Sequence, residues 1–272
     1  MIAYPASVSG TLTRVLEAGS GAESVIFVHG VGARADRWRS TIEFVAAAGF
    51  HCFALDLPGH GFAKKGPDFP YSVSGYADFI GHFLDENSIG RAHFVGTSLG
   101  AHILATLTCR RPELARSLVL VGATGLFPIG EEACNAIANR VVDRSRAGIE
   151  RKLRVVMYEA NRVTAQMIEE EYAINNSPGS EETFAKLAVY FRTQLDADVV
   201  GERLAALGSL IPKLLIWGEE DRTVPIAIGR KAQELLRNAP LVSIPRTAHA
   251  PYAENPDEFN AILLNFFESQ IS

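Results

Sequence analysis

Three residues in this chain have the types and the order that nucleophilic attack on a carbonyl requires. Ser98 lies in the stretch VGTSLGA, after an apolar run and before a helical pattern. A serine hydroxyl is a poor nucleophile until a neighbouring base takes its proton. His249, in SIPRTAHAPYAENP, is the candidate base, and Asp221, in WGEEDRTVP, is the candidate acid that orients it. The order Ser, Asp, His along the chain therefore predicts a catalytic triad.

The glycines on either side of Ser98 predict a sharp bend between a strand and a helix. Residues 96–100, GTSLG, fit the pattern G-x-S-x-G, in which the bend lifts the serine hydroxyl above the sheet. A glycine leaves room for strand and helix to pass closely. The alternative role for Ser98 is to cap the helix that follows. Because a base and an acid occur later in the chain, we favour the nucleophile.

Glu219 and Glu220 compete with Asp221 for the role of the acid. We favour Asp221 because it lies deepest in the loop after its predicted strand. Residues 122–124, GAT, follow the strand before that one and contain no acid, which removes one alternative position.

A turn after the first buried strand is the candidate oxyanion hole. In FVHGVGARADRW the predicted strand ends at Gly30, and the chain then turns through Val31 and Gly32. We expect the backbone N–H groups of Val31 and Leu99 to point at the carbonyl oxygen of the substrate. Each such donor is typically worth roughly 10²–10³ in rate. The alternative is an ordinary glycine turn with no catalytic role.

Short apolar runs separated by helical patterns predict the elements that position these residues. The runs lie at residues 24–30, 50–56, 91–97, 116–123, 213–221 and 240–245. Most are continuously apolar, which is typical of strands buried on both faces of a parallel sheet. Helical patterns at 37–49, 73–89, 99–112 and 256–269 complete the alternation. This alternation predicts an α/β fold with a doubly wound, mostly parallel sheet.

The alternation stops between residues 126 and 208, which are charged and helix-prone. We expect residues 1–125 and 209–272 to form the core, and residues 126–208 to form a helical lid over the ligand pocket that open α/β sheets carry at their carboxyl edge. The alternative is that the insertion only packs against the core. The residues expected to contact substrate are Gly30, Gly32, Phe127, Met157, Phe184, Phe191 and Ala250.

Composition argues against several other functions. The 272 residues carry a net charge of −5 and no basic stripe, so we expect no nucleic-acid partner. No run approaches about 18 apolar residues, and the first residues lack a signal-peptide pattern, so we expect a cytoplasmic protein without a membrane partner. The three cysteines, Cys52, Cys109 and Cys134, have no metal-ligand spacing. We expect a small-molecule substrate and no metal or organic cofactor; the oligomeric state is not predicted.

Five segments together carry a family resemblance. They are VHGVGA, LDLPGHGFA, FVGTSLGA, WGEEDRTVP and AHAPYAENPDEF. With these segments the chain resembles serine hydrolases of the α/β-hydrolase fold over essentially its whole length. Ser98 at the bend disfavours the haloalkane dehalogenases and epoxide hydrolases of that fold, which carry Asp there.

Within the fold, LLIWGEEDRTVP, PELARSLVLVG and the lid length resemble hydrolases that cleave a carbon–carbon bond in ring-fission products of aromatic catabolism. Those enzymes usually have Trp after the catalytic His, where this chain has Ala250. They also usually carry a lid Arg for the substrate carboxylate, but residues 170–182, EEYAINNSPGSEE, contain none. Arg162 and Arg192 are the candidate substitutes.

Carboxylesterases and lactonases of the fold share the core motifs without these two residues. We therefore expect hydrolysis of a small or medium, largely apolar ester or lactone through an acyl-enzyme. The first alternative is carbon–carbon bond hydrolysis of a vinylogous keto acid. The second is a protein that senses a ligand in the pocket and signals through its lid.

Overall fold

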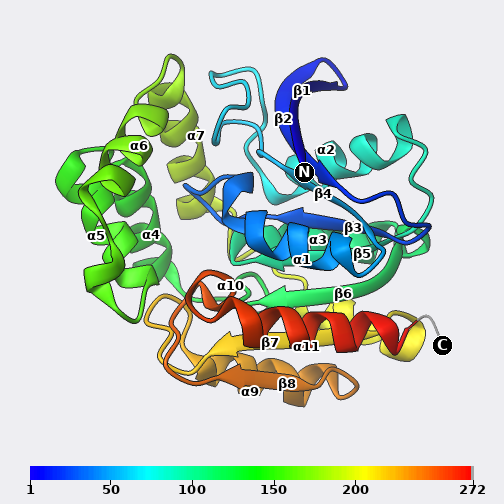
Figure 1. Ribbon diagram of the computed structural model, residues 1–272. Coiled ribbons are helices and arrows are strands. Elements are labelled where there is room, and N and C mark those ends of the chain that lie inside the picture. The colour runs from blue at the N-terminus through cyan, green and yellow to red at the C-terminus, as the bar shows by residue number, and fades with distance from the viewer. Residues whose placement is uncertain (271–272) are drawn as a thin grey trace.

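An eight-stranded sheet forms the centre of the computed structural model, which describes residues 1–270 (Figure 1). The strand order is β1-β2-β4-β3-β5-β6-β7-β8. The first two strands form an antiparallel hairpin at one edge, and the strands from β3 to β8 run parallel to one another. The bounds are β1 Ile2–Val8, β2 Thr11–Ala18, β3 Ser24–Val28, β4 His51–Leu55, β5 Ala92–Thr97, β6 Ala115–Val121, β7 Lys213–Gly218 and β8 Leu241–Ile244.

The six parallel strands coincide with the six apolar runs, so the prediction of a mostly parallel α/β sheet is confirmed. Every residue of β5 and β7 is buried, as expected of central strands covered on both faces. The hairpin β1–β2 was not predicted. Residues 3–7 of β1 alternate between exposed and half-buried, because this edge strand has only one covered face.

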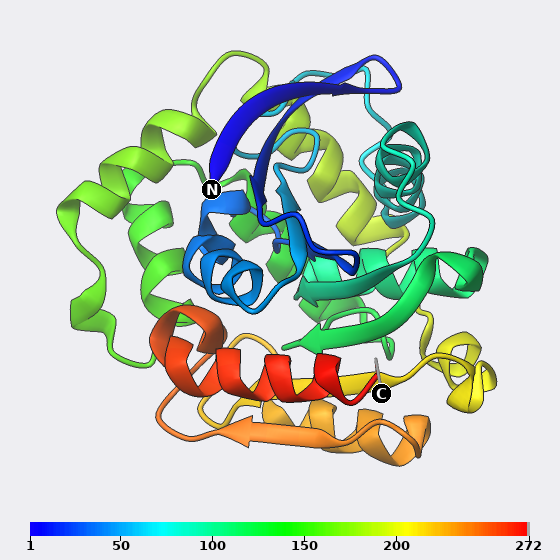
Figure 2. The same ribbon diagram turned by 45° about the vertical axis from the view of Figure 1, so that its right-hand side comes forward.

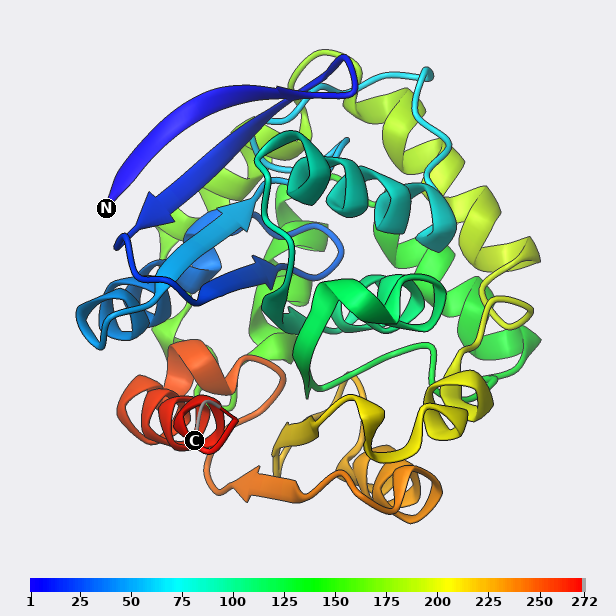
Figure 3. The ribbon, with the colours of Figure 1, turned by 90° about the vertical axis from the view of Figure 1, so that its right-hand side faces the viewer.

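Helices cover both faces of the sheet (Figure 3). On one face, α1 (Arg39–Ala47) and α11 (Pro256–Glu268) close one hydrophobic core layer. On the other face, α2 (Val73–Glu86), α3 (Leu99–Arg110) and α9 (Ile226–Leu236) close the second layer. The sheet is therefore doubly wound.

A helical insertion stands between β6 and β7, at the carboxyl ends of the parallel strands (Figures 1 and 2). It consists of α4 (Glu131–Val142), α5 (Arg146–Val156), α6 (Ala165–Asn175) and α7 (Ser180–Thr193). Helix α4 packs on α7, and α5 packs on α6. The next helix, α8 (Gly201–Ala206), contacts α3 and α9 instead. The insertion thus covers the edge at which the candidate residues lie.

Helix α10 (Pro251–Glu254) follows the loop after β8 and leads directly into α11. Within residues 1–270, no helix has both the length and the apolar character needed to cross a membrane.

Candidate active site

Ser98 occupies a sharp bend between β5 and α3. Its backbone has φ 53° and ψ −118°, an unusual conformation for a residue with a side chain. The Ser98 N–H donates to the carbonyl of Val121 at 3.0 Å, which fixes the bend to the neighbouring strand. In the described part of the chain, the Ser98 side chain makes no capping hydrogen bond to α3. The hydroxyl is therefore left for another role.

The glycines beside Ser98 are required by close backbone contacts. A Cβ on Gly96 would lie 2.5 Å from the carbonyl oxygen of Gly100. A Cβ on Gly100 would lie 2.3 Å from the carbonyl oxygen of Val28 on the adjacent strand. Any larger residue at either position would push α3 away from the sheet and move the serine.

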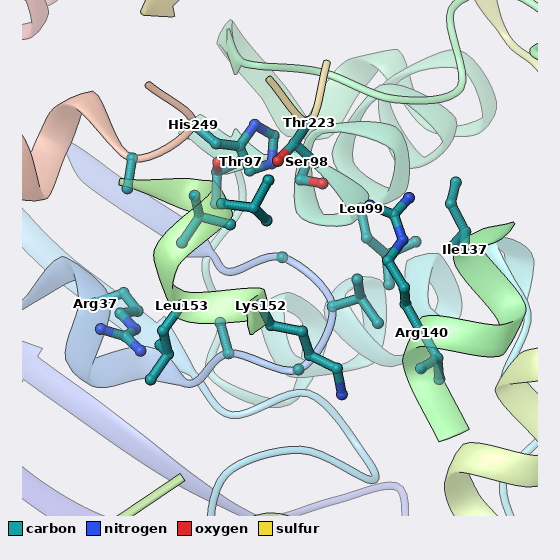
Figure 4. Close-up of a pocket in the computed structure, with 18 of the residues that line it drawn as sticks. Arg37, Thr97, Ser98, Leu99, Ile137, Arg140, Lys152, Leu153, Thr223 and His249 are labelled. Carbon is teal, nitrogen blue, oxygen red and sulfur yellow. The ribbon is translucent and has the colours of Figure 1, made fainter. Parts of the chain in front are cut away.

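His249 and Asp221 come together from two loops that follow neighbouring strands. The Nδ1 atom of His249 lies 2.7 Å from Oδ2 of Asp221, and both side chains are buried. The other carboxylate oxygen, Oδ1, accepts the N–H groups of Thr223 at 2.7 Å and Val224 at 2.9 Å. His249 and Ser98 lie on the same side of the cavity (Figure 4). With Nδ1 donating to Asp221, Nε2 is the ring atom available to accept the serine proton.

The two competing acids have other partners. Glu219 accepts a hydrogen bond from the Ser243 hydroxyl at 2.8 Å, and Glu220 accepts from the backbone N–H of Thr247 at 3.2 Å. Of the three acids in this loop, the structure places Asp221 against His249.

The predicted oxyanion loop runs beside Ser98. A Cβ on Gly30 would lie 3.1 Å from the Cβ of Ser98, and Gly30, Val31 and Leu99 all line the cavity with the serine. Gly32 has φ 69°, so the turn uses a conformation that favours glycine. Leu99 is the first residue of α3, where free N–H groups and the helix dipole favour a negative charge.

His29 supports this loop, a role that was not predicted from the sequence. The Leu57 N–H donates to Nε2 of His29 at 3.0 Å, so Nδ1 carries the proton and donates to the carbonyl of Gly30 at 2.8 Å. Complete burial lowers the pKa of His29, which favours this neutral form. The signal in the sequence is a histidine directly before the glycine turn.

Ser98, His249, Val31 and Leu99 line one cavity of about 230 Å³ between the sheet edge and the insertion. Its lining is mostly apolar and includes Leu153, Met157, Phe184, Phe191, Ala250 and Tyr252. The expected contact residues Gly30 and Gly32 lie there as well. Phe127 does not line this cavity, and its expected role is corrected. Its ring instead packs under the ammonium group of Lys231, with 4.2 Å from Nζ to the ring centroid.

Four basic side chains also line the cavity, whereas its lining within residues 1–270 includes neither Asp nor Glu. They are Arg37, Arg140, Arg144 and Lys152. Arg140 extends from α4 toward Leu99 and Ser98 (Figure 4). Its Nε donates to the Ala136 carbonyl of its own helix at 3.3 Å, and no carboxylate among residues 1–270 pairs with it.

Lys152 has a different environment from Arg140. Its ammonium group donates to the backbone carbonyl of Asp143 at 2.8 Å. Burial lowers the pKa of Lys152 to about 8, because the charged form loses solvation.

Neither arginine expected to substitute for the missing lid arginine faces the cavity. Arg162 donates to the backbone carbonyl of Glu254 at 3.0 Å, and Arg192 donates to the Asn139 side chain at 2.8 Å. Of the basic groups in the cavity, Arg140 lies on α4, Lys152 on α5 and Arg144 between these helices, and Arg37 comes from the core. None of the four was predicted as a site residue from the sequence.

The site brings together a hydroxyl, an imidazole held by a carboxylate, and backbone donors beside them. Such a set can attack a carbonyl and stabilise the oxyanion that forms. Residues 1–270 contain no group of three or more His, Cys, Asp or Glu side chains arranged to hold a metal ion.

Comparisons with known proteins agree with this geometry. The chain is 28% identical to a 2-hydroxy-6-oxononadienedioate/2-hydroxy-6-oxononatrienedioate hydrolase of Burkholderia vietnamiensis, over 92% of this chain and 88% of the relative. It is 29% identical to the dihydrolipoyllysine-residue acetyltransferase component of the acetoin cleaving system of Cupriavidus necator, over 95% of this chain and 67% of the relative.

Solved structures give the same result. A meta-cleavage product hydrolase from Pseudomonas fluorescens matches with a TM-score of 0.86 and 26% identity, over 98% of this chain and 97% of the other. The sequence model described as "Alpha/beta hydrolase family" matches residues 25–262. This chain, with a serine at the bend after β5, is a serine hydrolase that belongs to the alpha/beta hydrolase family.

Proposed function

We propose that this hydrolase acts on a carbonyl compound that carries at least one carboxylate. Ser98 attacks the carbonyl carbon while His249 accepts the hydroxyl proton. The N–H groups of Val31 and Leu99 hold the oxyanion, and Asp221 stabilises the imidazolium. The tetrahedral intermediate then collapses, the bond to the leaving group breaks, and His249 returns the proton to that group. Water then attacks the acyl-enzyme while His249 takes a proton from it. The second tetrahedral intermediate collapses, His249 returns the proton to Ser98, and the acid product is released.

The charge of the cavity is the observation that supports this substrate class. Four basic side chains line it, and none of its lining residues within 1–270 is Asp or Glu. Arg37 pairs with Glu171 and Arg144 with Glu181, but the exposed Arg140 extends toward Leu99 with no carboxylate of residues 1–270 paired with it. A guanidinium at the wall of a cavity binds a carboxylate well, because its planar group matches a carboxylate with two parallel hydrogen bonds. A bound acid would therefore supply a counter-charge for Arg140.

The carbon–carbon bond next to the ketone of a vinylogous keto acid is the leading candidate for the bond that is cleaved. Relatives at 26–28% identity are named as hydrolases of 2-hydroxy-6-oxo dienoic acids and dienedioates, which are mono- and dicarboxylic acids. The missing arginine in residues 170–182 no longer counts against this reaction, because Arg140 and Arg144 reach the cavity from the first part of the insertion.

An ester or lactone is the second candidate. It is favoured by Ala250, a small residue directly after His249 at the cavity wall, where the resemblance leads us to expect Trp in carbon–carbon bond hydrolases. In both candidates Ser98 attacks the carbonyl carbon and His249 transfers protons. An ester or lactone releases an alkoxide, which His249 protonates on oxygen. Carbon–carbon cleavage first requires a proton on the carbon next to the ketone, so that the breaking bond leaves its electron pair in a conjugated enolate.

The test compares a 2-hydroxy-6-oxo-dienoic acid with neutral p-nitrophenyl butyrate at equal enzyme concentration. We expect a higher kcat/KM for the acid. Arg140→Gln should raise KM for the acid about tenfold and leave KM for the neutral ester unchanged, because only the acid pairs with the guanidinium.

Arg192→Gln is the matched control, since Arg192 lies on the insertion but outside the cavity. It should behave as the wild type with both substrates. Preference for the neutral ester, together with no effect of Arg140→Gln on the acid, would overturn the proposed substrate class.

A further inference from the structure

We propose that Glu171 is a positioning residue that ties the helical insertion to the oxyanion loop. This inference rests on the proposed function, because it assigns Glu171 an effect on the loop that holds the oxyanion. Glu171 lies on α6, and only 3% of its surface is exposed. Its Oε1 accepts hydrogen bonds from Arg34 Nη1 at 2.6 Å and from Arg37 Nη2 at 2.8 Å. One buried carboxylate of the insertion thus holds two arginines of the core.

Both arginines belong to the segment that follows Val31. Arg34 lies three residues after Val31, and Arg37 itself lines the cavity. Between them, the N–H of Ala35 donates to Oδ1 of Asp56 at 2.7 Å. The segment is therefore held from the core by Asp56 and from the insertion by Glu171.

A continuous row of charges links these two anchors. Arg34 Nε pairs with Asp36 at 2.9 Å, Asp36 pairs with Arg14 at 2.5 Å, and Arg14 Nε pairs with Asp56 at 2.9 Å. Arg14, Arg34 and Asp36 are partly buried and Asp56 is fully buried. Separating such paired charges is costly, so the network favours one arrangement of its side chains. The position of α6 is thereby transmitted to the loop that carries the Val31 amide.

The consequence for catalysis follows from geometry. An oxyanion donor acts only where its N–H lies within hydrogen-bond distance of the developing charge. Without the Glu171 carboxylate, Arg34 and Arg37 lose their shared counter-charge, and the segment loses its anchor to the insertion. The position of the Val31 amide relative to Ser98 should then be less well fixed. This lowers stabilisation of the transition state more than it lowers the affinity for substrate.

The experiment compares Glu171→Gln with Glu170→Gln. Glu170 is the preceding residue on the same helix and also pairs with Arg34, at 3.0 Å, but 47% of its side chain is exposed to solvent. Comparison of the two variants therefore distinguishes the buried contact of Glu171 from the exposed contact of Glu170. The measurements are kcat and KM for p-nitrophenyl butyrate, and the dissociation constant of an alkyl boronic acid, which adds to the serine as a tetrahedral anion.

We expect Glu171→Gln to lower kcat about tenfold and to weaken boronate binding by the same factor, with KM within about twofold of the wild type. Glu170→Gln should match the wild type in all three. If Glu171→Gln leaves kcat and boronate affinity unchanged, the residue has no positioning role and the inference fails.

A second variant and a wild-type control distinguish loss of folding and loss of the proposed function from loss of positioning. If Glu171→Gln does not fold, as judged by circular dichroism, Glu171→Asp replaces it, and the same loss of kcat and boronate affinity is expected in smaller measure. A wild-type protein that hydrolyses neither the ester nor the 2-hydroxy-6-oxo-dienoic acid, and does not bind the boronate, would overturn the proposed function itself, which separates the two failures.

Discussion

The imidazole of His249 and the carboxylate of Asp221 meet at 2.7 Å, and the second oxygen of that carboxylate is held by two backbone N–H groups. The carboxylate is therefore fixed before substrate arrives. It presents one oxygen to Nδ1 of the ring and leaves Nε2 toward the cavity that Ser98 lines. This arrangement orients the ring so that Nε2 can accept a proton.

Replacement of Asp221 by Asn tests this arrangement. The amide keeps the shape of the side chain but can hold the ring in the opposite tautomer, with Nε2 protonated. We expect kcat to fall by about 10³–10⁴ while the fold is retained. Steady-state kinetics and circular dichroism measure both effects.

Glu219→Gln is the matched control, since Glu219 lies in the same loop but pairs with Ser243. It should leave kcat unchanged. Equal losses of kcat in the two variants would mean that the conformation of the loop, and not the Asp221 carboxylate, determines the rate.

Gly96→Ala tests the bend that carries the serine. The added Cβ meets the Gly100 carbonyl at 2.5 Å, a backbone atom that cannot turn away. We expect the free energy of unfolding to fall by about 3 kcal/mol. Urea denaturation measures this change.

Gly90→Ala provides the comparison for that variant. A Cβ on Gly90 would meet no atom within 4 Å, so the free energy of unfolding should change by no more than about 0.5 kcal/mol. Identical urea midpoints of unfolding for the two variants and the wild type would contradict the close packing of β5 on α3.

The lowered pKa of Lys152 predicts a pH dependence of substrate binding. Burial lowers this pKa to about 8, so the ammonium charge is present below that pH and is lost above it. KM for an acid substrate should therefore stay constant from pH 6.5 to about 7.5 and rise about three- to tenfold by about pH 9.5. KM for a neutral ester should not follow this curve.

Lys152→Arg isolates that group, because a guanidinium keeps its charge throughout this range. The variant should show no rise of KM with pH for the acid substrate. A rise that persists in Lys152→Arg would assign the titration to another residue.

The sequence predicted the parts of the molecule whose physical signals are local. Strands β3 to β7 are almost entirely buried, and their continuous apolar runs reveal them; the half-buried edge strand β8 has a shorter apolar run. The hairpin β1–β2 lies at the sheet edge and carries no such run. The bend at Ser98 was likewise readable, because its glycines are dictated by neighbours close in the chain and on the adjacent strand.

The cavity wall was less predictable, because it depends on which face each insertion helix turns inward. Phe127 was expected at the wall but lies under Lys231, whereas Arg140 reaches the cavity from a helix that the pattern did not single out. Glu171 occurs in a run of three glutamates, a pattern typical of an exposed helix surface. Its burial depends on two arginines that lie more than 130 positions away in the chain.

The most direct test of the proposed serine chemistry is covalent labelling with a fluorophosphonate, followed by intact-mass measurement and peptide mapping. The reagent reports an activated serine whatever the natural substrate is. We predict one adduct per chain, on Ser98, that disappears in Ser98→Ala and forms far more slowly in His249→Gln. An unlabelled wild-type protein, or equal labelling of Ser98→Ala, would contradict the assignment of Ser98 as the nucleophile.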